Sequence, residues 1–320
     1  MTKLVIQIPC YNEEETLGIT LGDLPREVAG IDEVEWLVID DGSTDGTVRV
    51  AREHGVAHIV DQGSNQGLAK AFMAGLHQSL RVGADIIVNT DADNQYQAAD
   101  IVKLVAPILA GEADIVVGAR PIEDTDHFSA VKKALQRLGS WVVRIVSKTD
   151  IADAPSGFRA YSREAALRVN VFNSYTYTLE TIIQAGLRGM KIISVPIRTN
   201  GDLRPSRLIN SIPRYIFRSV TTIIRIFMIY NPLRFFLLLG SVPFAFGVLL
   251  GLRYLILLIG GTERAHLPSL VLAALLIGTS LSLWMLGLIA DLMAANRSLL
   301  EDIQLRGRRA EFAADEDETR

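Results

Sequence analysis

The sequence predicts an α/β protein with a parallel sheet, followed by two helices that cross a membrane. From residue 3 to about 120, short apolar runs alternate with helix-like stretches, which is the rhythm of βαβ units. The hydrophobic content of 49% is high for a wholly soluble protein, and the excess lies in two uncharged runs near the C-terminus.

The expected strands are the apolar runs at residues 4–8, 36–39, 58–60, 85–88, 115–117 and 191–199. Apolar side chains at helical spacing mark residues 47–54, 67–80, 98–109 and a longer stretch at 128–146. Helices are expected to begin at Ser43 or Thr44 and at Gln97. These elements predict a parallel sheet that helices cover on both faces.

Two apolar runs predict a transmembrane hairpin at residues 231–294, with helices at about 233–259 and 267–291. The first run is uncharged from Phe235 to Leu252, and Arg253 is the exception within that span, where it is expected to reach the outer interface. Each run can cross a hydrocarbon core of roughly 30 Å as a helix. Arginines flank the pair, whereas the connecting loop holds only Arg264, so the positive-inside rule places both chain ends in the cytosol. The protein is therefore expected in the cytoplasmic membrane. Buried core helices are the competing interpretation, which two adjacent runs of this length disfavour.

The hairpin divides the rest of the chain into a first domain at 1–205, amphipathic juxtamembrane helices at 206–230 and a cytosolic tail at 295–320. Arginines on the polar side of the juxtamembrane stretch suit a membrane interface, where anionic headgroups add attraction. An ordinary helix docked on the first domain is the alternative. The acidic chain end is expected to be solvated, and the paired spans are compatible with a homo-oligomer.

Composition excludes several other classes of protein. A net charge of −4 argues against a general nucleic-acid binder. The single Cys10 excludes an intrachain disulfide and a cysteine-based zinc cluster, and we expect it to be a small buried residue. Because the chain opens on a strand-like run without a charged leader, we expect no signal peptide and a cytosolic first domain.

Asp91-Ala-Asp93 follows the apolar run at 86–88, where a parallel sheet holds its ligands. Two carboxylates one residue apart can converge on Mg²⁺ or Mn²⁺, and a cation with so few protein ligands keeps positions open for phosphate oxygens. A nucleoside diphosphate is the natural third partner. The alternative is a polar strand end whose acids face water.

Two other strand ends carry polar residues at the same edge of the expected sheet. Tyr11 offers an aromatic face for a base, Glu13 and Asp41 can accept hydrogen bonds, and Gly42 allows close backbone approach. Clustered carboxylates repel unless a cation or a donor compensates, so simple capping explains them less well. In the following loop and helix, Asn65 and Lys70 are candidates for ribose or phosphate; for Lys70 a plain surface lysine is equally compatible.

Several motifs together resemble the polyprenyl-phosphate branch of glycosyltransferase family 2, which includes dolichol-phosphate mannose synthase. They are Ile8-Pro9-Cys10-Tyr11-Asn12-Glu13, Asp40-Asp41-Gly42-Ser43-Thr44-Asp45, Asn65 with Gly67, Asp91-Ala92-Asp93 with Gln95, Val117-Gly118-Ala119-Arg120 and Ser156-Gly157-Phe158-Arg159-Ala160-Tyr161. The resemblance implies a GT-A (Rossmann-like) fold with a mixed, mainly parallel sheet. It also implies a UDP- or GDP-linked sugar donor, a divalent metal, and inverting transfer to polyprenyl phosphate.

The resemblance also implies roles for individual residues. Nucleotide binding falls to Pro9, Tyr11, Asn12, Glu13, Asp41, Ser43, Asn65, Lys70, Asp91 and Ala92. The metal falls to Asp91, Asp93 and Gln95. Acceptor binding is assigned to Arg120, Arg137, Arg159, Arg204, Ser206 and Arg207, and direct catalytic roles to Asp93, Asp153 and Arg159. Arg204 and Arg207 are candidates because arginine matches phosphate geometry with paired donors, and a contact with a lipid headgroup is the alternative for them.

A lipid phosphate is ionised near neutral pH, so it can attack without a dedicated base, and we assign none. For Asp153, orientation of the site and a structural hydrogen bond to its own loop are both open. The chain departs from the family pattern at Asp202-Leu-Arg204-Pro-Ser206-Arg207, where Gly-Glu-Ser-Lys is usual, and at Trp141, where Asn is expected. A processive polysaccharide synthase and a catalytically silent membrane scaffold are the rival hypotheses.

Overall fold

The chain forms two compact units, which are described separately. The first comprises Met1–Phe217 with Gln304–Arg320, and the second comprises Arg218–Ile303. The computed structural model describes residues 1–121, 140–141, 143–145, 147–171, 177–201, 217, 220–221, 224–225, 227–260 and 267–318, with side chains described as far as 312.

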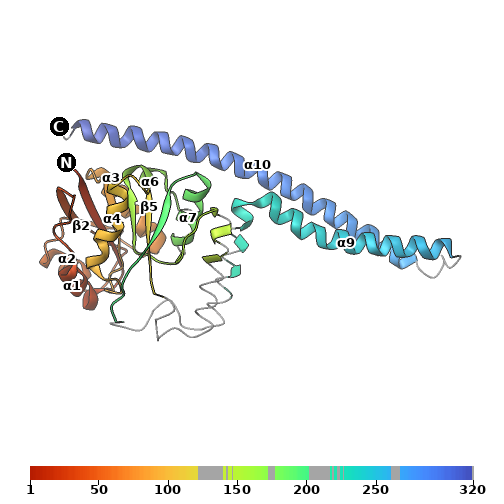
Figure 1. Cartoon of the computed structure of the whole chain (residues 1–320), viewed down its shortest axis with the longest axis horizontal. Helices are drawn as coiled ribbons and strands as arrows, with labels where there is room; N and C mark the ends of the chain where they lie inside the picture. The colour runs from red at the N-terminus through yellow and green to blue at the C-terminus, as the bar shows by residue number, and fades with distance from the viewer. Residues whose placement is uncertain are drawn as a thin grey trace. The chain divides into compact units, whose positions relative to one another are not determined.

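The first unit is built on a seven-stranded sheet with the order β3-β2-β1-β4-β6-β5-β7 (Figure 1). Its strands are β1 (Lys3–Cys10), β2 (Glu33–Asp40), β3 (His58–Asp61), β4 (Ile86–Asn89), β5 (Ile115–Ala119), β6 (Arg159–Ser162) and β7 (Ile192–Pro196). Only β6 runs antiparallel to its neighbours β4 and β5; the other pairs are parallel. A mixed, mainly parallel sheet is thereby confirmed.

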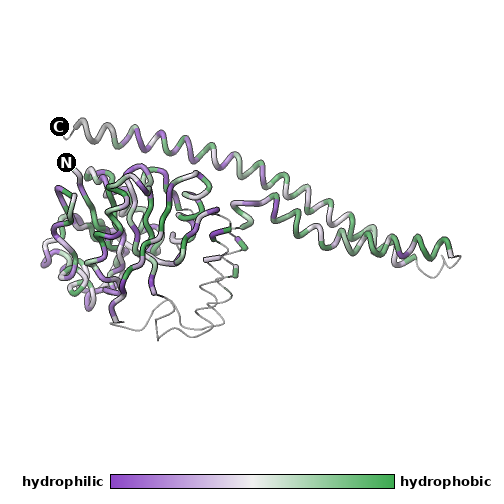
Figure 2. The backbone as a smooth tube through the Cα atoms, viewed as in Figure 1, coloured by the Kyte–Doolittle hydropathy of each residue, from purple (hydrophilic) through white to green (hydrophobic). Residues whose placement is uncertain are grey.

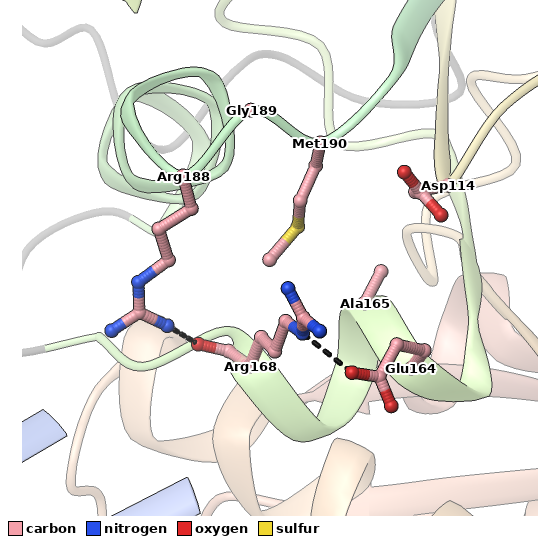
Figure 3. A pocket seen from close by; sticks show the side chains of 7 residues that line it. All are labelled: Asp114, Glu164, Ala165, Arg168, Arg188, Gly189 and Met190. Carbon is pink, nitrogen blue, oxygen red and sulfur yellow. Dashed lines mark hydrogen bonds and ion pairs between the residues drawn. The ribbon is translucent and has the colours of Figure 1, made fainter. Parts of the chain in front are cut away.

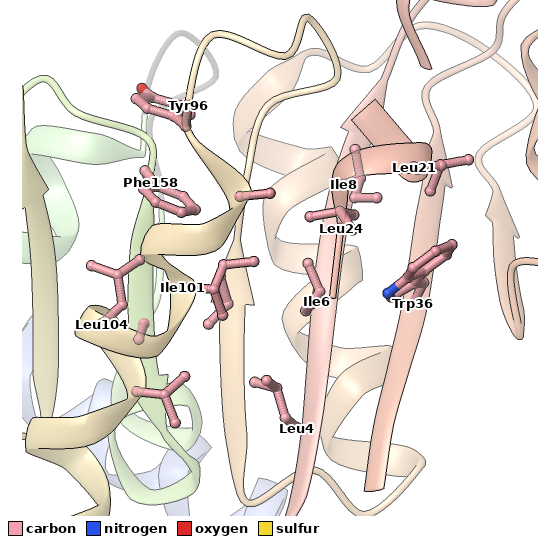
Figure 4. Packing of buried hydrophobic residues seen from close by; sticks show 14 of the residues in the cluster. Leu4, Ile6, Ile8, Leu21, Leu24, Trp36, Tyr96, Ile101, Leu104 and Phe158 are labelled. Atoms are coloured by element: carbon pink, nitrogen blue, oxygen red, sulfur yellow. The ribbon is translucent and has the colours of Figure 1, made fainter. Parts of the chain in front are cut away.

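Helices cover both faces of the sheet. They are α1 (Glu14–Asp23), α2 (Thr47–Glu53), α3 (Leu68–Arg81), α4 (Ile101–Leu109, after a 3₁₀ turn, Ala98–Asp100), α6 (Arg163–Arg168) and α7 (Thr178–Leu187). Alternate residues of β1 serve the two faces, because successive side chains of a strand point in opposite directions. Ile6 joins a core with Leu21 of α1 and Leu104 of α4 (Figure 4). Gln7 lies against Gly75 of α3.

Strand register sets where the polar loops emerge. Cys10 lies opposite Asp40, so β1 and β2 end together, and Gln7 lies opposite Asn89, so β4 ends at the same edge. Cys10 is buried, as expected. The carboxyl ends of three parallel strands therefore deliver their loops to one edge, where such sheets bind ligands.

The second unit contains α9 (Pro232–Ile259) and the apolar part of α10 (Leu267–Glu318). Both are long and apolar enough to cross a membrane, with mean hydropathies of 2.3 and 2.1 in their most apolar windows (Figure 2). Small residues let the two helices approach closely: a Cβ atom at Gly240 would lie 2.7 Å from the Trp284 ring, and one at Gly247 would lie 2.8 Å from Ile277.

The second helix differs from the expectation. The transmembrane helix is expected to end near residue 291, whereas α10 continues as one helix to Glu318, and its last residues belong to the first unit. The cytosolic tail at 295–320 stays a prediction. Arg308 is 7% exposed and donates to the carbonyls of Leu167 and Val169 at 3.2 and 2.9 Å. These carbonyls lie at the C-terminal end of α6, where the last carbonyls of a helix have no partner within the helix.

The start of α2 also differs. It begins at Thr47 rather than at Ser43 or Thr44, because Asp45 Oδ1 accepts the backbone N–H of Thr47 at 3.0 Å and ends the preceding turn. The expected helix at 128–146 and the juxtamembrane helices at 206–230 lie mostly outside the described residues.

Candidate functional site

Asp91 and Asp93 lie in the loop that follows β4, and both are half-buried. Burial and the nearby Asp93 carboxylate raise the pKa of Asp91 to about 7, against the opposing effects of Arg120 and a hydrogen bond from Tyr96. Within the described ranges, no lysine or arginine forms an ion pair with either carboxylate. Two repelling carboxylates in a partly desolvated place favour a cation.

The residues present fit a divalent cation that shares its coordination with a substrate. In the described part of the chain, no group of three or more His, Cys, Asp or Glu side chains is arranged to hold a metal. The turn itself is closed by Asp93 Oδ1, which accepts the backbone N–H of Gln95 at 3.2 Å. Mg²⁺ and Mn²⁺ tolerate two protein carboxylates when phosphate oxygens and water complete the shell.

The segment before β6 packs directly on Asp91. A Cβ atom at Gly157 would lie 3.1 and 3.2 Å from the two carboxylate oxygens of Asp91 and 3.0 Å from the Tyr177 hydroxyl. The N–H of Gly157 donates to the Tyr96 hydroxyl at 3.1 Å, and its carbonyl accepts from the Asn89 amide at 3.0 Å. Glycine is needed here because the carboxylate approaches the backbone so closely.

Hydrogen bonds tie the loop after β1 to the loop after β2. Asn12 adopts a φ of 54°, its N–H donates to Ser43 Oγ at 2.9 Å, and its Oδ1 accepts the N–H of Thr44 at 2.8 Å. Tyr11, in the same loop, is 42% exposed, so its ring offers a surface on which a base can stack. Asn12 and Ser43 thus shape the loop that presents Tyr11.

Asp41 holds the loop that leads into α3. Its two carboxylate oxygens accept the N–H groups of Gln66 and Gly67 at 2.7 and 2.9 Å. Gly42 has a φ of 74°, and a Cβ atom there would lie 2.6 Å from the backbone of Ser64. Gly42 therefore does allow a close backbone approach, and the backbone that approaches it is the protein's own loop at Ser64.

The remaining nucleotide candidates lie near the same edge. Asn65 and Lys70 are exposed, and Lys70 Nζ lies 3.3 Å from Gln66 Oε1. Glu13 is half-buried and accepts from the Thr16 hydroxyl at 2.9 Å. The side chains of Pro9 and Ala92 are buried.

Asp153 is bound to Arg120 rather than open to a substrate. Arg120 Nε and Nη2 lie 2.7 and 3.1 Å from the two Asp153 oxygens, and the Arg120 N–H lies 3.3 Å from one of them. The side chains of Arg120 and Asp153 are 12% and 1% exposed. Because both oxygens of Asp153 bind Arg120, orientation of Arg120 is the role that fits this geometry, and the direct catalytic role stays a prediction.

Arg159 is also placed differently from the expectation. The residue is 0% exposed. Its guanidinium donates to the carbonyls of Ser156, Ala154 and Thr178 at 2.7, 2.6 and 2.8 Å, and to the Thr181 hydroxyl at 2.7 Å. Arg159 thus shapes the loop that carries Gly157, and its catalytic and acceptor roles stay predictions. The other acceptor candidates, Arg137, Arg204, Ser206 and Arg207, lie outside the described residues.

Sequence reasoning missed the polar residues behind Asp91. Gln7 and Asn89 are buried on neighbouring strands and are joined by a 2.8 Å hydrogen bond, and the Asn89 amide also donates to the Tyr177 hydroxyl at 2.8 Å. Amides inside otherwise apolar strands are the signal that was available, because a buried amide needs partners.

A cavity of about 240 Å³ lies elsewhere, at the amino ends of the parallel strands (Figure 3). Its arginines are already engaged: Arg168 pairs with Glu164 at 2.5 Å, and Arg188 donates to the Arg168 carbonyl. The cavity is at the opposite edge of the sheet from Asp91 and is not the candidate site.

This α/β unit, with paired carboxylates at the carboxyl edge of its sheet, has the architecture of nucleotide-binding α/β proteins. Residues 5–169 match glycosyl transferase family 2, so the chain belongs to that family.

Among curated proteins, the chain is 31% identical over 201 residues to an undecaprenyl-phosphate mannosyltransferase of Micrococcus luteus, covering 59% of this chain and 80% of that protein. It is 29% identical over 221 residues to a polyprenol monophosphomannose synthase of Mycolicibacterium smegmatis, covering 65% and 82%. A UDP-N-acetylglucosamine–dolichyl-phosphate N-acetylglucosaminyltransferase of Methanococcus voltae is 28% identical over 214 residues, covering 60% and 83%.

Among solved structures, glucosyl-3-phosphoglycerate synthase from Mycobacterium tuberculosis, in complex with Mn²⁺, UDP and glucosyl-3-phosphoglycerate, superposes with a TM-score of 0.53. The sequence identity is 20%, and the match covers 69% of this chain and 80% of that one. This likeness shows the expected GT-A-like fold.

Proposed function

We propose that this protein transfers one sugar from a nucleoside diphosphate sugar to a polyprenyl phosphate at a membrane surface. Family membership supplies the reaction class, and three relatives are named for polyprenyl, undecaprenyl or dolichyl phosphate acceptors. The observation that carries the proposal is the union, in one chain, of the Asp91–Asp93 pair with two helices long enough to cross a membrane. A water-soluble acceptor would require no such helices.

On the donor side, Tyr11 stacks on the base while Asn12, Glu13 and Ser43 shape the loop around it. Asp91, Asp93 and Gln95 would hold Mg²⁺ or Mn²⁺ against the diphosphate. A cation bound there supplies charge neutralisation for the leaving group. Lys70 is exposed near the start of α3 and adds a mobile positive charge for the same phosphates.

The reaction is one displacement. An oxygen of the lipid phosphate forms a bond to the anomeric carbon while the bond from that carbon to the diphosphate breaks, and the nucleoside diphosphate leaves with the electron pair. The attacking oxygen is already ionised, so no proton is moved. The chain's task is positioning and charge stabilisation.

On the acceptor side, Arg120 is the described arginine that we assign to the lipid phosphate, with Asp153 fixing its orientation. Arg137, Arg204, Ser206 and Arg207 remain sequence-based candidates for the same role. The relatives are named for different sugars, mannose and N-acetylglucosamine, so the sugar is left to experiment.

A donor panel tests the reaction. The protein in detergent is incubated with labelled UDP- and GDP-sugars, Mg²⁺ or Mn²⁺, and undecaprenyl phosphate, and the products are extracted into chloroform. We expect a lipid-soluble product that carries one sugar. A polymer would indicate a processive synthase instead, and no turnover with any donor by correctly folded protein would refute an enzymatic role.

We further propose that both chain ends and the first unit face the cytosol. The chain's single cysteine, Cys10, is buried, so a maleimide should label the wild type only weakly. A membrane-impermeant maleimide should label Thr262→Cys, in the hairpin loop, in intact cells. It should label Asp315→Cys, near the C-terminus, only after the cells are opened. The reverse pattern would invert the proposed topology.

A further inference from the structure

A chain of buried hydrogen bonds runs from the interior of the sheet to the Tyr96 hydroxyl, which lies near Asp91. It starts with Gln7 of β1, whose amide donates to Asn89 of β4 at 2.8 Å. Asn89 donates in turn to the Gly157 carbonyl at 3.0 Å and to the Tyr177 hydroxyl at 2.8 Å. Gln7 and Asn89 are 0% exposed. Polar groups buried this deeply hold their partners in place, because a lost partner is costly.

The last link in this chain is the Tyr96 hydroxyl. It accepts the N–H of Gly157 at 3.1 Å, which occupies one lone pair. Its single proton is then free to face the nearby Asp91 carboxylate, and this interaction lowers the pKa of Asp91. The Tyr96 hydroxyl therefore links the Gly157 backbone to the Asp91 carboxylate, so the position of one depends on the position of the other.

The Tyr96 ring is held on several sides. The residue is 4% exposed, and its ring stacks on Phe158 with centroids 4.9 Å apart and planes 8° apart (Figure 4). Its backbone forms a bridge with Thr199. The side-chain amide of Asn200 donates to the carbonyls of Asn94 and Tyr96 at 2.9 and 3.4 Å. The hydroxyl consequently has little freedom to move away from Asp91.

We infer that Tyr96 is a positioning residue, which orients the Asp91 carboxylate toward the divalent cation. This inference rests on the proposed metal role of Asp91. It assigns to Tyr96 the function that carboxylates and carbonyls serve behind many metal ligands, where loss of the outer partner weakens metal binding by about tenfold to a hundredfold. The substitution Tyr96→Phe removes the hydroxyl and keeps the stacking on Phe158.

Mn²⁺ binding to the purified full chain tests this assignment. Free Mn²⁺ is followed by electron paramagnetic resonance during titration, with Mn²⁺ alone and with saturating UDP or GDP. For Tyr96→Phe we expect the Mn²⁺ dissociation constant to rise about tenfold while the melting temperature stays close to the wild-type value. In turnover assays the variant should need more Mn²⁺ but should approach the wild-type kcat when the metal is saturating.

Tyr161→Phe is the matched control. Tyr161 is 0% exposed on β6, and among the described residues its hydroxyl has no hydrogen-bond partner. The control loses a buried tyrosine hydroxyl without touching the chain to Asp91, so its Mn²⁺ affinity should equal that of the wild type. Equal Mn²⁺ affinity in the wild type, Tyr96→Phe and Tyr161→Phe would refute the positioning role and leave the proposed function standing.

Two further outcomes are decisive. If the wild type binds no Mn²⁺ with either nucleotide, both the metal role and the positioning role fail. If Tyr96→Phe does not fold, Gly157→Ala replaces it: the added methyl presses on both oxygens of Asp91 and should also weaken Mn²⁺ binding. Wild-type Mn²⁺ affinity in a folded Gly157→Ala variant would overturn the inference.

Discussion

Two sets of carboxylates in the first unit differ in how their charge is balanced. Asp153 and Asp100 are each matched to an arginine, Arg120 at 2.7 Å and Arg198 at 2.7 Å. Asp91 and Asp93 lie beside each other, and the described residues form no ion pair with them. Arginines of the protein pair with Asp153 and Asp100, whereas Arg120 only partly offsets the charge of the Asp91–Asp93 pair, and a bound cation would balance the rest.

The difference gives a physical criterion for the site. A buried ion pair that loses one partner is strongly destabilised, so arginine-matched acids carry structural roles. In an acid pair without such a partner, each carboxylate disfavours ionisation of the other, as the raised pKa of Asp91 shows. The repulsion lowers the stability of the fold, and a bound cation would relieve it. The presence or absence of an arginine partner thus separates the structural acids Asp100 and Asp153 from the candidate metal ligands Asp91 and Asp93.

The largest expected effect is on the unmatched pair. Asp93→Asn should lower turnover by on the order of a thousandfold, because the charge that balances the cation at the leaving diphosphate is lost. The melting temperature should be unchanged or higher, since repulsion of Asp91 is relieved. Labelled-product assays and thermal unfolding measure the two effects. Glu53→Gln, on the exposed face of α2, is the control; wild-type turnover in Asp93→Asn would refute the metal assignment.

A matched pair should respond in stability. Arg120→Ala leaves Asp153 buried and unpaired, so we expect the free energy of unfolding in detergent to fall by about 3 kcal/mol. Arg120→Met combined with Asp153→Leu should recover much of that loss, because no charge is then stranded. A single variant as stable as the wild type would show that the pair is not a structural unit.

The second matched pair makes a pH prediction. Burial acts to raise the pKa of Asp100, but hydrogen bonds from Arg198 and Lys103 outweigh it and lower the pKa from 3.8 to about 2. A lowered pKa stabilises the fold above the ordinary value, and this stability is lost as pH falls through about 2. Because the Arg198 side chain is 61% exposed and screened by solvent, Asp100→Asn should cost only about 1–2 kcal/mol at pH 7.

Acid unfolding curves check this prediction. The stability difference between the wild type and Asp100→Asn should shrink as pH falls below 3.8. Asp150→Asn is the control, because the Asp150 side chain is 99% exposed. A difference that stays constant down to pH 2 would contradict the assigned ion pair.

The smallest effect should have the opposite sign. Asp91→Asn keeps an acceptor for the Tyr96 hydroxyl and removes one of the two repelling charges, so at pH 8 without metal the fold should gain about 1 kcal/mol. Denaturant unfolding with and without Mn²⁺ measures this gain. Mn²⁺ with nucleotide should stabilise the wild type but not the variant. A metal-free variant less stable than the metal-free wild type would show that Asp91 and Asp93 do not destabilise the fold by repulsion.

Much of the fold was accessible from the sequence because local patterns encode it. The apolar runs at β1, β2, β4 and β5 and the long uncharged runs of α9 and α10 all appear as elements. The antiparallel β6 was missed, because Arg159–Ser162 is a four-residue strand with a charged first residue. The continuation of α10 beyond the apolar run was missed since its contacts, such as Arg308 with the carbonyl of Leu167, join residues far apart in the chain.

The sequence allowed us to predict which residues form the site, but not which contacts they make. Asp91 and Asp93 could be found because a short motif sits at a strand end. The burial of Arg159 could not, because its partners are backbone carbonyls that a sequence does not display. The same limit hid Tyr96, whose meaning depends on a Gly157 N–H far along the chain.

The docked end of α10 bears on how this enzyme can be dissected. Phe312 is 4% exposed and its ring meets His77 of α3, while Arg81 pairs with Glu311 at 3.0 Å. A fragment cut at residue 201 to obtain a soluble domain would therefore lack part of its own surface. It would expose an apolar strip and unsatisfied carbonyls, and would tend to aggregate. A synthetic helix of residues 304–320 supplied in trans is the natural complement for such a fragment.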